Sequence, residues 1–109
     1  MKKVLVIVDP QNDFITGALA VEGAKEKMEK LTEYLSDNLY NEVMVTMDTH
    51  PSDHCSFVEN GGQWPTHCVD LTEGWDIPEH IQHLLDMYSM LEDVNVTFWC
   101  KGTETDKEE

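Results

Sequence analysis

The order of the apolar segments constrains the fold of this chain more than any other feature. The run Val4–Val8 is continuous and largely β-branched, and similar runs occupy residues 43–47 and 94–99. Such runs are typical of strands that are buried in a parallel sheet. Between them, residues 22–38 and the segment that begins at Pro78 repeat apolar side chains at helical spacing, which predicts two amphipathic helices.

Strands and helices that alternate in this order form βαβ units with right-handed crossovers. We therefore predict an α/β fold, a three-layer Rossmann-like parallel sheet with helices on both faces. The length of 109 residues suits one domain, which we expect to span residues 1–109. The segment between the second strand and the second helix is roughly 30 residues long, and loops of that length in a compact domain are usually functional.

The chain is strongly acidic, with 7 Lys and Arg, 22 Asp and Glu, and a formal net charge of −15. Such a surface repels phosphate groups, so nucleic acids and anionic membranes are not expected partners. The N-terminal apolar run ends at Asp9 and Pro10, which makes it too short for a signal peptide or a membrane span. Three irregularly spaced cysteines, Cys55, Cys68 and Cys100, argue against a disulfide framework and indicate free thiols in a cytoplasmic protein.

Charged side chains follow all three predicted strands. Asp9 follows the first strand, Asp48 and His50 follow the second, and Lys101 follows the third. Because ligands bind at the carboxyl ends of the strands in doubly wound sheets, these residues are candidates for a binding or catalytic site. Asp9 and Lys101 would face each other, and each would favour the charged form of the other. A structural ion pair at the edge of the sheet is the alternative interpretation.

The sequence MDTHPSDHCSF at residues 47–57 contains candidate metal ligands. Asp48 and His50 lie two positions apart on an extended segment, so their side chains point the same way. A turn at the following proline lets His54 return to the same point, and His67 follows in WPTHC. One carboxylate with up to three imidazoles suits a divalent ion such as zinc, manganese or iron. Capping and loop roles in a polar segment are the alternative.

Two His-Cys doublets, at residues 54–55 and 67–68, could instead form a closed zinc site of two His and two Cys. Their spacing matches no zinc finger, and adjacent side chains point apart in extended backbone. Cys100 could be a nucleophile because it precedes Lys101. Neighbours in a strand face opposite sides, however, and we expect Cys100 to pack in the core.

Four blocks of the sequence, taken together, point to a known family. The blocks are VIVDPQNDF at residues 6–14, VTMDTHPSDHCSF at 45–57, WPTHCV at 64–69 and KGTE at 101–104. In this order, they resemble the nicotinamidase and pyrazinamidase branch of the isochorismatase-like cysteine hydrolases. The resemblance runs through the entire chain. The pattern D-x-H-x3-H followed by W-P-x-H separates this branch from the isochorismatases, which lack that metal site.

The resemblance implies a role for each matching residue. Asp9 resembles the general base that takes a proton from a cysteine thiol, and Lys101 resembles its partner in a catalytic triad. Phe14 and Trp64 match the aromatic residues that sandwich the substrate ring. In such enzymes a metal ion holds the pyridine nitrogen of nicotinamide, and the reaction yields nicotinate and ammonia through a cysteine thioester, a step of NAD salvage. The family's metal ligands match four residues, Asp48, His50, His54 and His67.

One part of the family pattern is missing. The family's nucleophilic cysteine lies in a block after the fourth strand, and this chain has no such block before Glu109. We therefore expect the N-terminal part of a hydrolase domain, without its C-terminal strands and inactive alone. One face and edge of its sheet would be uncovered, which predicts self-association or a complementing chain. Two other functions stay open, a non-catalytic metal-binding or interaction module and a hydrolase of another small amide.

Overall fold

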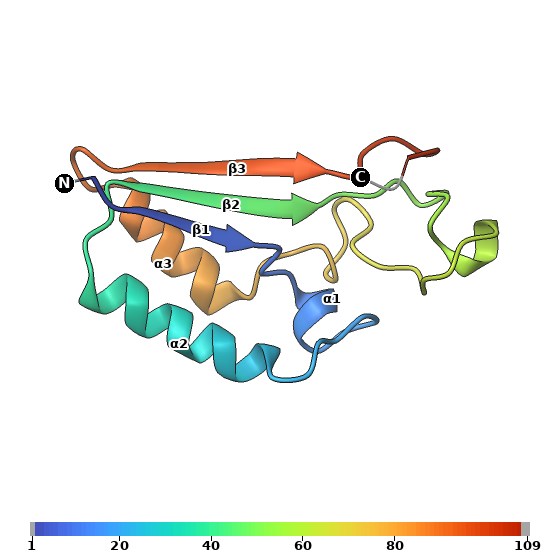
Figure 1. The fold of residues 1–109 in the computed structure, drawn as a ribbon, viewed down its shortest axis with the longest axis horizontal. Coiled ribbons are helices and arrows are strands. Elements are labelled where there is room, and N and C mark those ends of the chain that lie inside the picture. The colour runs from blue at the N-terminus through green and yellow to red at the C-terminus, as the bar shows by residue number, and fades with distance from the viewer. Residues whose placement is uncertain (1, 108–109) are drawn as a thin grey trace.

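The computed structural model describes residues 2–107, which form a parallel sheet of three strands with helices packed against it (Figure 1). The sheet order is β1-β2-β3, and both strand pairs are parallel. The predicted parallel βαβ order is therefore confirmed. Met1 and residues 108–109 of the predicted domain lie outside the described residues. The elements are β1 (Val4–Val8), α1 (Asn12–Ile15), α2 (Ala24–Asp37), β2 (Glu42–Asp48), the 3-10 helix η1 (Val58–Asn60), α3 (Glu79–Ser89) and β3 (Asn95–Lys101).

The second and third strands extend further toward their carboxyl ends than the apolar runs predict. Asp48 and Lys101 are the last residues of β2 and β3 rather than the first residues of the following loops. They are also register partners, so their side chains leave the sheet on the same side. This extension places a carboxylate and an ammonium group side by side before any loop begins.

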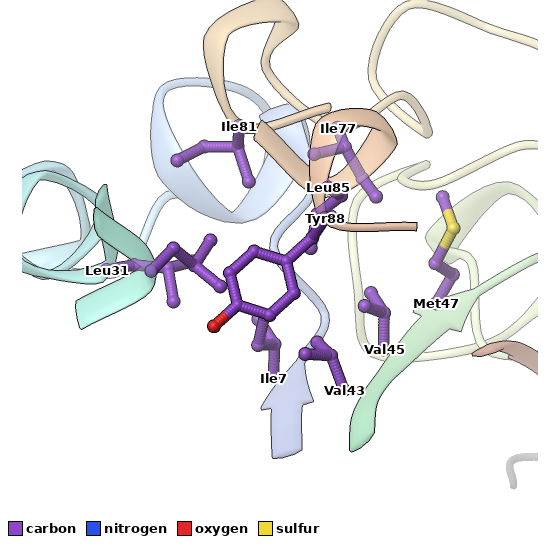
Figure 2. Packing of buried hydrophobic residues seen from close by; sticks show 10 residues of the cluster. Ile7, Leu31, Val43, Val45, Met47, Ile77, Ile81, Leu85 and Tyr88 are labelled. Carbon is purple, nitrogen blue, oxygen red and sulfur yellow. The ribbon is translucent and has the colours of Figure 1, made fainter. Parts of the chain in front are cut away.

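The hydrophobic core lies between one face of the sheet and the two long helices (Figure 2). The Tyr88 ring from α3 packs over the strands, and its hydroxyl donates a hydrogen bond to the Asn38 carbonyl at 2.6 Å and accepts one from the Tyr40 amide at 2.9 Å. These bonds tie α3 to the end of α2. The buried core residues are Ile7, Leu31, Leu35, Val43, Val45, Met47, Ile77, Ile81, Leu85 and Tyr88.

The opposite face of the sheet is open in the part of the chain that the structure describes. Both α2 and α3 cover the same face (Figure 1), while Val6, Val8 and Trp99 are 56%, 67% and 56% exposed. An uncovered face is what the sequence predicts for a sheet without its later strands.

The expectation that Cys100 packs in the core is wrong, because this residue is exposed near the end of an edge strand. Within residues 2–107 no helix has both the length and the apolar character of a membrane span.

Candidate active site

Three charged side chains meet at the carboxyl ends of the strands. Lys101 Nζ lies 2.7 Å from Asp48 Oδ1 and 2.9 Å from Asp9 Oδ2. Asp9 adopts a positive φ of 51° directly after β1, and Thr46 Oγ1 donates a hydrogen bond to its Oδ1 at 2.8 Å. One ammonium group therefore bridges two carboxylates, one directly after β1 and the other at the end of β2.

Asp48 and Lys101 alter each other's ionisation. Burial raises the pKa of Asp48, but hydrogen bonds from His50 and Lys101 oppose burial and lower this pKa to about 2. Burial lowers the pKa of Lys101, while its hydrogen bonds to Asp48 and Asp9 raise it, and the net direction is upward. The Asp48 carboxylate and the Lys101 ammonium are thus both charged at neutral pH.

His50 and His67 direct the same ring nitrogen at Asp48. The Nδ1 atom of His50 lies 2.7 Å from the Gly102 carbonyl, and Nδ1 of His67 lies 2.8 Å from the Pro65 carbonyl. A carbonyl oxygen only accepts, so each Nδ1 carries a proton, and Nε2 has a free lone pair only while the ring is neutral. These Nε2 atoms lie 3.5 Å and 3.9 Å from Asp48 Oδ2. Burial lowers the pKa of His50, but its hydrogen bond to Asp48 raises it, and the net direction is upward.

The loop that carries His67 is tied to the end of β2 by backbone hydrogen bonds. The His50 amide donates to the Cys68 carbonyl at 3.0 Å, and the Asp70 amide donates to the His50 carbonyl at 2.9 Å. The Cys68 amide in turn donates to Asp13 Oδ2 at 2.8 Å. Cys68 needs this support because its φ of 49° is uncommon for a residue with a side chain.

His54 is near this group, but both of its nitrogens already have partners. Its ring centroid lies 4.0 Å from that of His50, and its side chain is fully buried. Nδ1 accepts a hydrogen bond from the Ser56 amide and lies 2.7 Å from Ser56 Oγ, so Nε2 carries the proton that is donated to the Lys107 carbonyl at 2.7 Å. His54 therefore has no free lone pair in this arrangement.

The geometry thus brings together three of the four residues that match the family's metal ligands. One donor atom from each of Asp48, His50 and His67 lies within 4.8 Å of the other two. A carboxylate oxygen and two imidazole nitrogens suit a divalent ion such as zinc, and carbonyl partners on the distal nitrogens orient ligand rings in this way. The donor set and the tautomers therefore fit a metal ion.

Two hollows adjoin this group and contain the aromatic residues singled out in the sequence. A hollow of about 210 Å³ is lined by the metal-ligand candidates together with Trp64 and Lys101. A second hollow, of about 330 Å³, is lined by Phe14 and Trp64 and also reaches Asp48 and His67. A wider hollow of about 880 Å³ lies along α3 and shares no residue with either. The aromatic side chains and the proposed metal ligands therefore share one site.

Sequence reasoning missed two residues that build this site. Gln11 is fully buried and contacts the backbone of Asp48. Asp13 holds the Cys68 amide, and a side chain at Gly74 would overlap the Asp13 carboxylate. Both residues stand in the PQNDF segment directly after the first strand. The signal in the sequence was the run of polar residues directly after a buried strand, at the edge of the sheet where ligands bind.

None of the three cysteines lies among the described residues that line the two hollows. Cys68 is fully buried, and burial raises the pKa of its thiol well above the usual range. Cys55 donates its backbone amide to the Thr105 carbonyl at 2.7 Å. The closed zinc site of two His and two Cys from the His54-Cys55 and His67-Cys68 doublets is therefore not formed in the described part of the chain. The group of possible metal donors in the structure contains no sulfur.

The chain is similar to known proteins over most of its length. It is 40% identical over 79 residues to the nicotinamidase/pyrazinamidase of Mycobacterium tuberculosis, covering 68% of this chain and 42% of that protein. The pyrazinamidase of Pyrococcus horikoshii in complex with zinc superposes with a TM-score of 0.74 and 34% identity, covering 100% of this chain and 56% of that one. No protein-family model matches the chain.

A second solved structure agrees even better in shape. The yeast nicotinamidase bound to the inhibitor nicotinaldehyde gives a TM-score of 0.84 at 28% identity, covering 97% of this chain and 59% of that one. The chain spans about half the length of the curated relatives that it matches. Its partial coverage of these relatives fits the N-terminal part of a member of their family. Sequence and fold agree that the chain belongs to the nicotinamidase/pyrazinamidase branch of the isochorismatase-like hydrolases.

Proposed function

We propose that this chain supplies the base, the lysine and the metal-binding residues of an amidase that hydrolyses nicotinamide to nicotinate and ammonia. The observation that carries the proposal is the group of Asp48, His50 and His67 beside the Asp9–Lys101 pair. Solved relatives support it, because one is a pyrazinamidase in complex with zinc and another is a nicotinamidase bound to nicotinaldehyde. The proposed substrate class is therefore a small heteroaromatic carboxamide.

The proposed metal site uses the lone pairs on Nε2 of His50 and His67 and one oxygen of Asp48. When bound, a divalent ion supplies a Lewis-acidic point for an electron-pair donor such as a ring nitrogen. His54 would complete the set only if its proton moved from Nε2 to Nδ1, where Ser56 Oγ could accept it, and Nε2 left the Lys107 carbonyl. The donor atoms favour a borderline divalent metal such as zinc, manganese or iron and do not distinguish among these three.

The proposed substrate site places the ring between Phe14 and Trp64. Both side chains line the hollow of about 330 Å³, which also reaches Asp48 and His67. This volume lies at the lower end of the range for small-molecule pockets, as suits a single aromatic ring. Phe14 and Trp64 would supply apolar contact area, and the metal-binding group would orient the ring nitrogen.

The proposed chemistry assigns separate tasks to Asp9 and Lys101. Thr46 and Lys101 fix the two oxygens of the Asp9 carboxylate, which would take the proton from a cysteine thiol as it attacks the carboxamide carbon. The charge of Lys101 would favour the thiolate over the thiol. No described cysteine lines the two hollows, so we expect residues 1–109 alone to bind the substrate class without turning it over.

A binding measurement and an activity measurement test the proposal separately. Calorimetric titration of the zinc-loaded chain should detect nicotinamide and nicotinate and show much weaker binding of benzamide, which has the same shape without the ring nitrogen. Equal binding of benzamide would contradict the proposed role of the metal. Ammonia release from nicotinamide should be absent, and turnover that disappears when Cys55, Cys68 or Cys100 is replaced would contradict the assignment of roles.

A further inference from the structure

The backbone of Asp48 lacks a strand partner on the β1 side. β1 ends at Val8, and the Asp9 amide makes the last backbone hydrogen bond on that side, to the Thr46 carbonyl at 3.0 Å. In a parallel sheet, residues two positions apart direct their backbone groups to the same neighbouring strand. Asp48 therefore points its N–H and C=O toward the place that β1 has left.

The carboxamide of Gln11 fills this place. Its Oε1 accepts the Asp48 amide hydrogen bond at 2.9 Å, and its Nε2 donates to the Asp48 carbonyl at 2.7 Å. The second Nε2 hydrogen is donated to the Trp75 carbonyl at 2.9 Å. One side chain thus acts as the missing strand partner and also holds the loop that follows His67. Its exposed fraction is 0%, so water cannot replace these bonds.

We propose that Gln11 is a positioning residue that fixes Asp48 in the orientation needed for metal binding. The two oxygens of Asp48 have different neighbours, Lys101 at Oδ1 and the two imidazoles at Oδ2. A small rotation at the end of β2 would lengthen both sets of contacts. Gln11 hydrogen-bonds to no proposed ligand atom and acts through the backbones of Asp48 and Trp75.

The residue type follows from the partners. A carboxamide offers an acceptor at one end and two donors at the other, and the site presents one amide N–H and two carbonyl oxygens. A carboxylate of the same shape would accept the Asp48 amide but would also face the Asp48 and Trp75 carbonyls without a proton to donate. Gln11→Glu therefore breaks the clamp with almost no change in volume.

Asn12 provides a matched control. It is the next residue in the chain, and its Nδ2 donates to the Glu73 carbonyl at 2.9 Å. It therefore ties the same two loops together without touching Asp48. Asn12→Asp changes amide to acid as Gln11→Glu does, so an effect confined to Gln11→Glu reports on the buried clamp that joins Asp48 and Trp75.

The first test uses the metal-free chain and does not depend on the proposed function. Amide hydrogen exchange followed by NMR should show the Asp48 amide protected although no strand lies on the β1 side, to which this amide points. In Gln11→Met this protection should be lost, while the Thr49 amide, which donates to the Lys101 carbonyl at 2.8 Å, keeps its protection. Unchanged protection of the Asp48 amide in Gln11→Met would overturn the proposal.

The second test rests on the proposed function and uses zinc and cobalt(II) as probes. Chelator competition should show zinc affinity reduced about 10- to 100-fold in Gln11→Glu, as is typical for residues behind metal ligands, with a changed ligand-field spectrum of the cobalt(II) form. Asn12→Asp should match the parent chain in both. If Gln11→Glu does not fold, Gln11→Asn replaces it in this test, because asparagine keeps the carboxamide on a side chain that is shorter by one methylene.

The outcomes separate the two proposals. Parent-like zinc affinity and cobalt(II) spectrum in Gln11→Glu would overturn the role of Gln11 while leaving the metal site in place. A parent chain that binds no zinc would contradict the proposed function, and the exchange of the Asp48 amide would then decide the role of Gln11 by itself.

Discussion

Lys101 and Asp48 are register partners at the ends of neighbouring strands, and Lys101 Nζ lies 2.7 Å from Asp48 Oδ1. The other oxygen of Asp48 faces the imidazoles of His50 and His67. A single carboxylate therefore joins the lysine of the proposed catalytic pair to the proposed metal site. Any change that moves Asp48 should therefore affect both parts together.

Removal of either imidazole should weaken zinc binding strongly. Both His50 and His67 direct Nε2 toward the Asp48 carboxylate, where a metal ion would bind all three groups. We expect His50→Ala and His67→Ala each to lower zinc affinity by more than the roughly 10- to 100-fold typical of residues behind the ligands. Competition with a chromophoric chelator measures this. His80→Ala, at an exposed position of α3, is the control, and an equal loss in that variant would contradict the site.

The segment after β3 should compete with a metal ion for His54. The Lys107 carbonyl accepts the Nε2 proton of His54, and the Thr105 carbonyl accepts the Cys55 amide. A chain that ends at Thr103 lacks both carbonyls, so we expect it to bind zinc more tightly than the parent chain. His54→Ala should abolish the gain. Equal zinc affinity of the two chains, or a gain that persists in His54→Ala, would show that His54 is not a conditional ligand.

The cysteines should differ sharply in their reaction with a thiol reagent. Cys100 is exposed, whereas Cys68 is fully buried and its pKa is raised by burial. Because the thiolate is the reactive form, Cys68 should react only after unfolding. Mass spectrometry after brief labelling of the native chain should find the label on Cys100 and none on Cys68. Rapid native labelling of Cys68 would show that the loop around His67 opens readily.

Loss of the Tyr88 hydroxyl should destabilise the fold. This hydroxyl serves the Asn38 carbonyl and the Tyr40 amide, both in the connection between α2 and β2. Tyr88→Phe leaves these backbone groups without their partner, which costs about 1–3 kcal/mol. Urea denaturation measures the free energy of unfolding. Tyr34→Phe, at an exposed tyrosine of α2, should change it far less.

The open face of the sheet should cause association between copies of the chain. Val6, Val8 and Trp99 are exposed there, and β1 and β3 both leave an edge unpaired in the described sheet. Sedimentation velocity should show association that increases with concentration, and Val6→Lys should reduce it. Val21→Lys, at an exposed apolar residue outside the sheet, is the control. Concentration-independent monomers would contradict this prediction.

The sequence predicted the strands and long helices to within a few residues because their apolar periodicity reflects burial directly. It erred where burial depends on neighbours that the pattern does not reveal. Cys100 follows an apolar run but is exposed, because β3 is an edge strand. Val8 belongs to a run typical of a strand buried on both faces and is 67% exposed, because both long helices pack on the other side of the sheet (Figure 1).

The sequence by itself determined the alternation of strands and helices along the chain and the types of side chain at the carboxyl ends of the strands, because both depend on local pattern. Only the tertiary structure decided which atoms meet. Gln11 clamps Asp48 and Trp75, 37 and 64 residues away, and His54 gives its Nε2 proton to a carbonyl 53 residues away. Such partners are chosen by how the loops pack together, and a single-chain pattern of hydrophobicity and charge carries no record of that packing.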